Sequence, residues 1–98
     1  MKNAYYKLEG TKAVECTDVK EWAEIWDTRA FRRVAQEVRG GVCVSTVFLG
    51  LDHQVGDGPP LLFETVVFGG KHPDSQERYS TWEEAEAGHA RWVAKVWP

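Results

Sequence analysis

The sequence is poor in cysteine, in surplus positive charge and in long apolar runs. Its only two cysteines are Cys16 and Cys43, far apart and outside any repeated pattern. A disulfide framework or a structural zinc site needs several cysteines at short, clustered spacings, so both are disfavoured. We therefore expect a protein of a reducing compartment, the cytosol.

Positive charge is also scarce, because 12 lysines and arginines face 15 acidic residues, which gives a net charge of −3 at pH 7. Proteins that bind DNA or RNA normally carry a basic patch that displaces counterions from the phosphates, so nucleic acid is a disfavoured partner. No stretch approaches the roughly 20 apolar residues of a membrane span, and the first residues lack the apolar run of a signal peptide. We expect neither secretion nor membrane insertion.

Tryptophan, by contrast, is abundant for a chain of 98 residues. The five tryptophans are Trp22, Trp26, Trp82, Trp92 and Trp97. Each buries on the order of 200 Å², enough to dominate a small core. The length suits one domain with one core, so we expect residues 1–98 to form a single domain that tryptophan stabilises in place of disulfides.

The first third of the chain predicts a hairpin followed by a helix. Two short apolar segments, residues 5–8 and 13–16, flank a turn and read as paired extended segments. Asp18 with Glu21 three residues later forms a capping box, followed by apolar residues at helical spacing. We expect this helix to end near Thr28.

Residues 31–38 fit two patterns, because their apolar residues match both helical spacing and strand alternation. We interpret them as a strand, since Gly40-Gly41 is a two-residue hairpin signal and residues 42–49 after it are rich in β-branched side chains. The alternative is a helix that Gly40 caps.

A hairpin at Gly40-Gly41 would place Val38 opposite Cys43 and Val34 opposite Val47. We predict that these four side chains, with Leu49, face the core. The opposite face of the second strand carries Val44, Thr46 and Phe48. That face is also apolar, so we expect it to close against a second copy of the chain as a homodimer. The alternative is a monomer with one helix on each face of the sheet.

The second half predicts a loop, a strand, a second loop and a helix. Residues 50–60 and 69–76 have loop composition, and residues 61–68 read as a buried strand. Thr81 with Glu84 forms a capping box for a helix that reaches about Val96. The glycine inside it, residue 88, reads as a tolerated flaw. The element order ββαβββα predicts an α+β fold, a mostly antiparallel sheet of about four to five strands with two helices.

His89 lies in the middle of an apolar stripe on the last predicted helix. The stripe consists of Trp82, Ala85, Trp92, Val93 and Val96. Buried polar groups find partners, so the favoured interpretation is a histidine bonded to a backbone carbonyl or to the Glu64 side chain. The alternative is a general base or a ligand contact.

Four further residues complete the candidate binding set: Asp52, His53, Glu64 and Arg78. Glu64 falls inside an apolar strand, so its carboxylate must be exposed, paired or protonated. Asp52-His53 reads as a solvated turn, with a general-base pair as the alternative. Arg78, together with His53 and His89, would suit a small-ligand pocket between sheet and helix.

Signals for catalysis are weak. Ser45 and Cys43 fall inside a strand without the glycine-flanked elbow of a nucleophile, and residues 54–60 lack the lysine and helix of a phosphate-binding loop. We therefore predict no catalytic residue, no metal and no cofactor. A small hydrolase using Asp52, His53 and Glu64 is the least favoured alternative.

Five segments carry a resemblance to a known family. They are YKLEG at 6–10, EWA at 21–23, VSTVFLGLDH at 44–53, GDGPPLLFETVVFGG at 56–70 and RYSTWEEAEAGHA at 78–90. This pattern resembles a family of small phage and prophage proteins without an assigned activity. The sequence departs from that pattern at Val66, where methionine is frequent, and at residues 41–43, where polar residues are usual.

The resemblance implies a phage setting and a location in the host cytosol, without a mechanism. Small phage accessory proteins often bind a host protein or a signalling molecule instead of catalysing a reaction. The favoured hypothesis is a non-enzymatic protein that binds a host component, for instance to block an antiviral defence complex. The alternative is a protein that binds or sequesters a small ligand or nucleotide.

Overall fold

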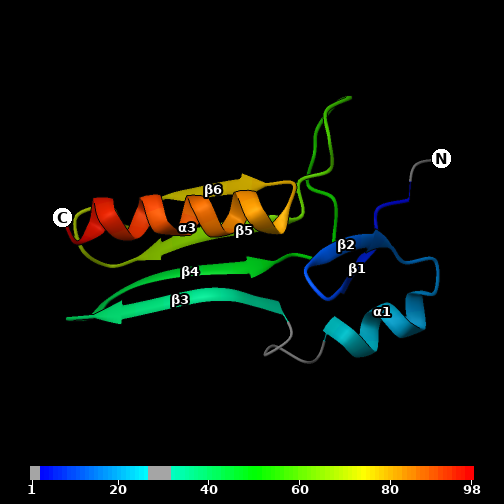
Figure 1. The fold of residues 1–98 in the computed structure, drawn as a ribbon, viewed down its shortest axis with the longest axis horizontal. Helices are drawn as coiled ribbons and strands as arrows, with labels where there is room; N and C mark the ends of the chain where they lie inside the picture. Colours follow the sequence, from blue (N-terminus) through cyan, green and yellow to red (C-terminus); the bar gives the residue numbers. More distant parts are fainter. Residues whose placement is uncertain (1–2, 27–31) are drawn as a thin grey trace.

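The structure, a computed structural model, describes residues 3–26 and 32–98 (Figure 1). Its elements are β1 (Tyr6–Glu9), β2 (Lys12–Glu15), α1 (Val19–Trp26), β3 (Arg33–Arg39), β4 (Val42–Phe48), β5 (Phe63–Phe68), β6 (Gln76–Tyr79) and α3 (Trp82–Val96). The predicted α+β class and element order are confirmed, with β6 as one further strand before the last helix. The strands form two antiparallel sheets, β1-β2 and β3-β4-β5-β6.

Helix α1 begins where the Asp18-Glu21 pattern predicts. The Asp18 carboxylate accepts hydrogen bonds from the backbone N–H groups of Lys20 and Glu21, at 3.0 and 3.3 Å, which satisfies donors that the helix leaves free. The Glu21 side chain accepts instead from Lys7 Nζ at 2.7 Å, which ties α1 to β1. The predicted helix end near Thr28 lies outside the described residues.

The hairpin between β3 and β4 turns at Gly40-Gly41, as predicted. Both glycines have positive φ, 56° and 77°, a conformation that favours glycine. Val38 pairs with Cys43, but the partner of Val47 is Arg33, because the register shifts between Arg33 and Ala35. Residues 33–39 are therefore a strand, and the helical alternative for the described part of this segment is wrong.

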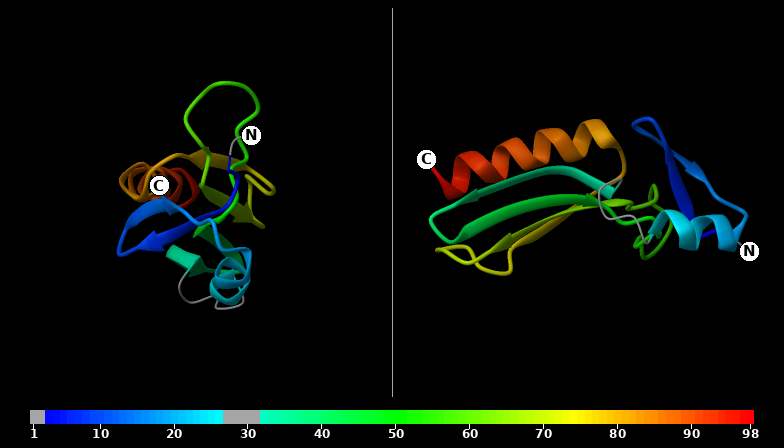
Figure 2. Two further views of the ribbon diagram at one scale, coloured as in Figure 1. Left: turned by 90° about the vertical axis from the view of Figure 1, so that its right-hand side faces the viewer. Right: turned by 90° about the horizontal axis from the view of Figure 1, so that it is seen from below.

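Helix α3 covers one face of the four-stranded sheet, as the edge view in Figure 2 shows. The covered face carries Val44, Thr46, Phe48, Phe63, Thr65 and Val67, all buried. The opposite, open face carries Val38, Cys43, Ser45, Val47, Val66 and Phe68. Among the described residues, no helix lies on the open face, and Val38 and Phe68 are 63% and 54% exposed.

This arrangement corrects the predicted core. Val38, Cys43 and Val47 are predicted to face the core, yet they lie on the open face, because both faces of β4 are apolar and alternation alone does not choose between them. Val34 does pack against the core, next to the irregularity of β3. The face of Val44, Thr46 and Phe48, predicted to join two copies of the chain, is instead buried under α3 within one copy.

The aromatic part of the core lies where the sheet, the start of α3 and the β1-β2 hairpin meet. The Phe63 ring packs against Phe48 at 5.3 Å and edge-on against Trp82 at 6.2 Å between ring centroids. Tyr6 from β1 and Leu62 belong to the same buried cluster. The hairpin is thereby held near the first turn of α3. No helix in the described part of the chain is long and apolar enough to cross a membrane.

Candidate functional site

Asp52 and His53 hold the ends of the loop between β4 and β5. Asp52 Oδ1 accepts hydrogen bonds from the backbone N–H groups of Gln54 and Leu61, at 2.8 and 3.0 Å. His53 Nδ1 lies 2.9 Å from the carbonyl oxygen of Leu51, and the His53 N–H donates to the Leu61 carbonyl at 3.0 Å. These contacts give both residues a part in shaping the loop.

Glu64 and Arg78 are brought together on neighbouring strands. They are direct partners in the β5-β6 register, and Arg78 Nε lies 2.9 Å from Glu64 Oε2. The Glu64 side chain is only 15% exposed, so the pair supplies the charge partner that a half-buried carboxylate needs. Of the predicted environments for Glu64, pairing is the one observed.

His89 lies on the other side of the sheet from this pair. Its Nδ1 atom is 2.7 Å from Thr46 Oγ1 on the covered face, so its observed partner is Thr46 and the expected contact with Glu64 is wrong. Arg78 lies on the open side with Glu64. Arg78 and His89 therefore lie on opposite faces of the sheet and do not line one pocket.

The contact between His89 and Thr46 begins a chain of buried hydroxyl groups. Thr46 Oγ1 lies 2.6 Å from Thr65 Oγ1, and Thr65 Oγ1 lies 3.0 Å from the Tyr79 hydroxyl oxygen. Glu77 Oε1 accepts from the Tyr79 hydroxyl at 3.1 Å and from Trp92 Nε1 at 3.0 Å. The chain crosses β4, β5 and β6 and returns to α3, so it fixes the helix on the sheet.

Burial shifts the pKa values of His89 and Tyr79, two members of this hydrogen-bonded network. It lowers the pKa of His89 below the usual 6.5, and the nearby Glu37 carboxylate offsets part of that shift. It also raises the pKa of Tyr79 to about 12; the hydrogen bond with Thr65 lowers this pKa and the Glu77 carboxylate raises it, each by less than burial does. His89 Nε2 is buried without a hydrogen-bond partner among the described residues, so a charged imidazole would be poorly accommodated.

The positions of two threonines in the sequence indicate part of this hydrogen-bonded network, although the amino-acid composition does not. Thr46 and Thr65 each stand mid-strand, with large apolar residues two positions away on both sides. Two such threonines on adjacent strands are expected to face each other once the register is known, and they do pair. The role of Glu77 as a shared acceptor could not be predicted from the sequence, because its two donors, Tyr79 on β6 and Trp92 on α3, belong to different elements.

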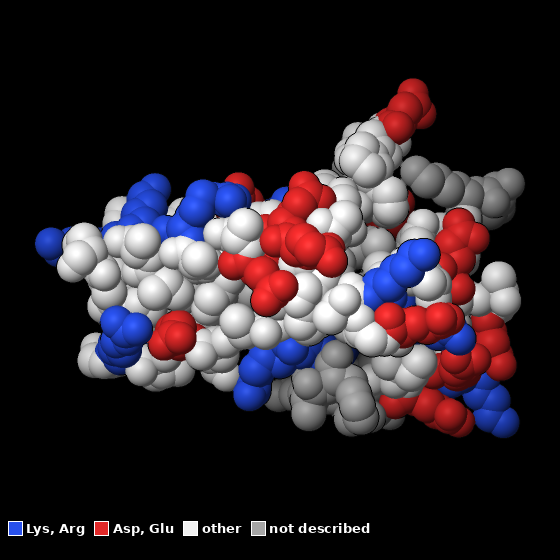
Figure 3. Space-filling model, viewed as in Figure 1, with Lys and Arg blue, Asp and Glu red and all other residues white. Residues whose placement is uncertain are grey.

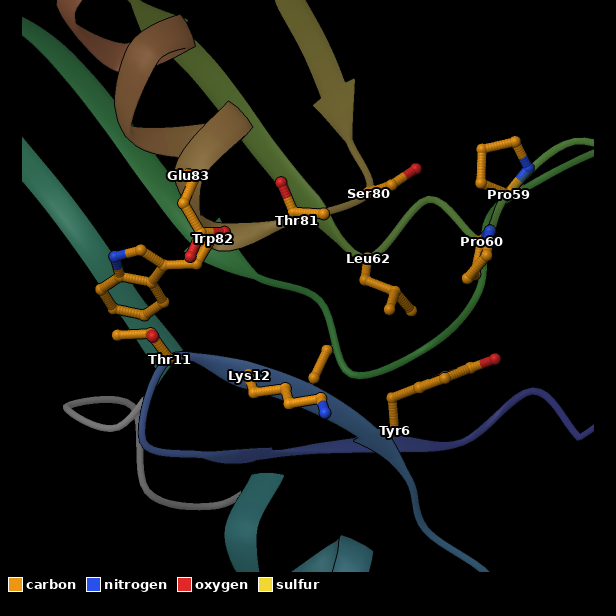
Figure 4. A pocket seen from close by; sticks show the side chains of 11 residues that line it. Tyr6, Thr11, Lys12, Pro59, Pro60, Leu62, Ser80, Thr81, Trp82 and Glu83 are labelled. Carbon is orange, nitrogen blue, oxygen red and sulfur yellow. The ribbon is translucent and has the colours of Figure 1, made fainter.

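A cleft of about 470 Å³ opens where the β1-β2 hairpin faces the first turn of α3 (Figure 4). Its lining residues are Tyr6, Thr11, Lys12, Ala13, Pro59, Pro60, Leu62, Ser80, Thr81, Trp82 and Glu83. Aromatic and aliphatic groups from three distant segments thus converge here. None of the five predicted site residues is among them.

Two groups of opposite charge lie on the cleft. Lys12 comes from β2, and Glu83 comes from the first turn of α3. The start of α3 is fixed by Thr81, whose hydroxyl accepts from the Glu84 N–H at 3.1 Å and donates to the Glu84 carboxylate at 3.0 Å. That confirms the predicted capping box, and it holds Trp82 and Glu83 in place beside the cleft.

The loop that supplies Pro59 and Pro60 projects from the body of the molecule beside this cleft (Figure 1). Val55 in that loop is 94% exposed, the highest value among the large apolar side chains that the structure describes. Because Asp52 binds the backbone at both ends of the loop, its base is fixed. The loop therefore carries an exposed apolar side chain, and its base lines the apolar cleft.

No group of three or more histidine, cysteine, aspartate or glutamate residues suited to a metal ion occurs in residues 3–26 and 32–98. Cys16 is buried, with its thiol 3.4 Å from the Asp18 carbonyl oxygen, and Cys43 is half-buried on the open face. No protein-family model, no curated protein and no solved structure matches this chain.

Proposed function

We propose that this chain is a non-enzymatic binding protein that holds an apolar segment of a partner protein between its cleft and the loop at residues 52–60. The single observation that carries the proposal is the placement of exposed Val55 on a fixed loop whose base, Pro59 and Pro60, lines the cleft. Cleft and loop are thus continuous at Pro59 and Pro60.

The chemistry of the cleft suits a protein partner. Tyrosine and tryptophan are enriched at protein interfaces because they give large contact areas with few rotatable bonds, and Tyr6 and Trp82 lie on either side of Leu62 in the cleft. Lys12 and Glu83 would orient the partner through its polar groups. The cleft would admit one large apolar side chain of the partner, while Val55 packs beside it.

The resemblance of the sequence to small phage proteins supports a host protein as the partner and the host cytosol as the place of binding. In this proposal the protein acts by occupying a surface of the host component, such as a subunit of an antiviral defence complex, and needs no catalytic group.

A capture experiment tests the proposal. Tagged wild-type protein is used to recover partners from host lysate, beside Ala13→Phe, which fills the cleft, and Val55→Glu, which charges the loop. Ala87→Phe, an equal change at an exposed position of α3 away from the cleft, is the matched control. We expect wild type and Ala87→Phe to recover the same host protein and both site variants to lose it.

A small ligand in the same cleft is the second candidate, favoured by one observation. A volume of about 470 Å³ falls within the roughly 300–1,000 Å³ of small-molecule sites. Intact-mass measurement under native conditions separates the two candidates, because a bound small molecule adds a discrete mass to the wild-type chain and none to Ala13→Phe. Recovery of neither a protein nor a small molecule would contradict both.

A further inference from the structure

The open face of the four-stranded sheet carries exposed apolar side chains that the cleft does not use. It presents Val38 and Phe68, both more than half exposed, on either side of the half-buried Cys43. Exposed apolar side chains grouped within a polar surrounding often mark a site of protein association. On the basis of its charge and its size, we infer that this face is covered by a second copy of the chain, with the long axes of the two copies antiparallel.

The charge of the open face permits self-association. The ion pair on its β5-β6 side, Glu64 with Arg78, is internally compensated, so two copies meet there without net repulsion although each chain carries a charge of −3. The acidic surplus lies elsewhere, on α1 with its cap Asp18 and in the first turn of α3, whereas the two lysines and two glutamates of the β1-β2 hairpin balance each other. Because the open face lacks this acidic surplus, two copies of the chain can approach each other there in spite of their like net charge.

The ends of the molecule select the antiparallel arrangement. Blue side chains predominate at the end where the chain finishes, and red ones at the start of α3 and around α1, while blue and red mix on the β1-β2 hairpin (Figure 3). Arg39, at the β3-β4 turn, and Lys95, in the last turn of α3, belong to the basic end. A two-fold axis perpendicular to the 42 Å long axis places the basic end of one copy over the acidic end of the other.

Size predicts a weak dimer. Four strands about 4.8 Å apart, each about six residues long at about 3.3 Å per residue, cover a plane of roughly 400 Å². A standard interface buries about 800 Å² of accessible surface per partner, so the sheet face needs the contacts between the oppositely charged ends. Dimerisation should therefore depend on protein concentration and weaken as salt is added.

Sedimentation equilibrium of the purified chain tests the inference, independently of the cleft. We expect a mass that rises with concentration from 11.1 kDa toward twice that value, and that falls again in high salt. Val38→Lys and Phe68→Lys, at exposed positions of the open face, should stay folded by circular dichroism and remain monomeric. The matched control Val55→Lys, at an equally apolar but distant position, should dimerise like wild type.

Cys43 gives a second readout that needs no variant. Its thiol should react more slowly with a maleimide as the concentration of wild-type protein rises, whereas buried Cys16 should be unreactive at all concentrations. A wild-type mass of 11.1 kDa throughout the concentration range would overturn the inference. So would a dimer that both lysine variants retain. If the wild type is monomeric and binds another protein that both lysine variants fail to bind, the open face is the binding site of that protein. This result would also contradict the proposed dimer.

Discussion

Gly88 on α3 lies so close to the ring of Tyr79 on β6 that a methyl group at position 88 would overlap the phenol. Glycine inside a helix costs about 1 kcal/mol relative to alanine, and from the sequence it reads as a flaw. In the structure it allows the Tyr79 hydroxyl to reach both Thr65 and Glu77 beneath the helix. The glycine is thus part of the contact between α3 and the sheet.

Gly88→Ala should therefore lower the free energy of unfolding by about 1–3 kcal/mol, because overpacking outweighs the gain in helix propensity. Urea denaturation measures the change. In a Tyr79→Leu background, where the ring is gone, the same substitution should cost much less. An increase in stability for Gly88→Ala in the wild-type background would show that the helix and Tyr79 are not in this contact.

Protonation of His89 should destabilise the fold. Its pKa is lowered in the folded chain by burial, so the unfolded chain, with a pKa near the usual 6.5, binds the proton more readily. Stability is then full above about pH 6.5 and declines as the pH falls through the window between 6.5 and the lowered folded pKa. Unfolding free energies of wild type and His89→Gln across this window check the prediction. The decline should be smaller in the variant, and equal slopes would contradict it.

Asp52 and His53 should differ in their effect on stability. Asp52→Ala removes an acceptor for the N–H groups of Gln54 and Leu61, and should cost about 1–3 kcal/mol without unfolding the chain. His53→Ala removes one contact with a carbonyl and should cost about 1 kcal/mol or less. Thermal melts of both variants give the comparison, and a larger loss for His53→Ala would reverse the assigned roles.

Adjacent residues of β5 should distinguish the two faces of the sheet. In a Cys43→Ser background at low protein concentration, Val66→Cys on the open face should react rapidly with a thiol reagent. Val67→Cys on the covered face should react only when the protein unfolds. Comparable rates for the two in the folded protein would mean that α3 does not cover this face.

Local signals predicted the fold well. The Asp18 and Thr81 caps begin helices at the expected residues, and Gly40-Gly41 makes the expected hairpin, because each depends on contacts within a few residues. Strand β6 was not assigned, since Gln76–Tyr79 is polar and only four residues long. Its place in the sheet is set by pairing with β5.

The face of the sheet that α3 covers and the position of the cleft could not be predicted from local sequence signals, because both depend on contacts between distant segments. Val42 to Phe48 is apolar on both faces, so the side that α3 covers is decided by neighbours such as Thr65 and Tyr79, which share one face only once the register is fixed. The cleft is built from β2, the β4-β5 loop and the start of α3, and no local pattern brings these together. The pairing of Glu64 was predictable from the sequence, because a largely buried carboxylate requires a charged or hydrogen-bonding partner.

The most direct test of the proposed function is the dissociation constant of the captured host protein for wild type, Ala13→Phe and the control Ala87→Phe, each first shown to be folded. We expect Ala13→Phe to weaken binding at least about tenfold, which corresponds to about 1.4 kcal/mol, while Ala87→Phe binds like wild type. Equal affinity of Ala13→Phe and wild type would contradict the assignment of the cleft as the binding site.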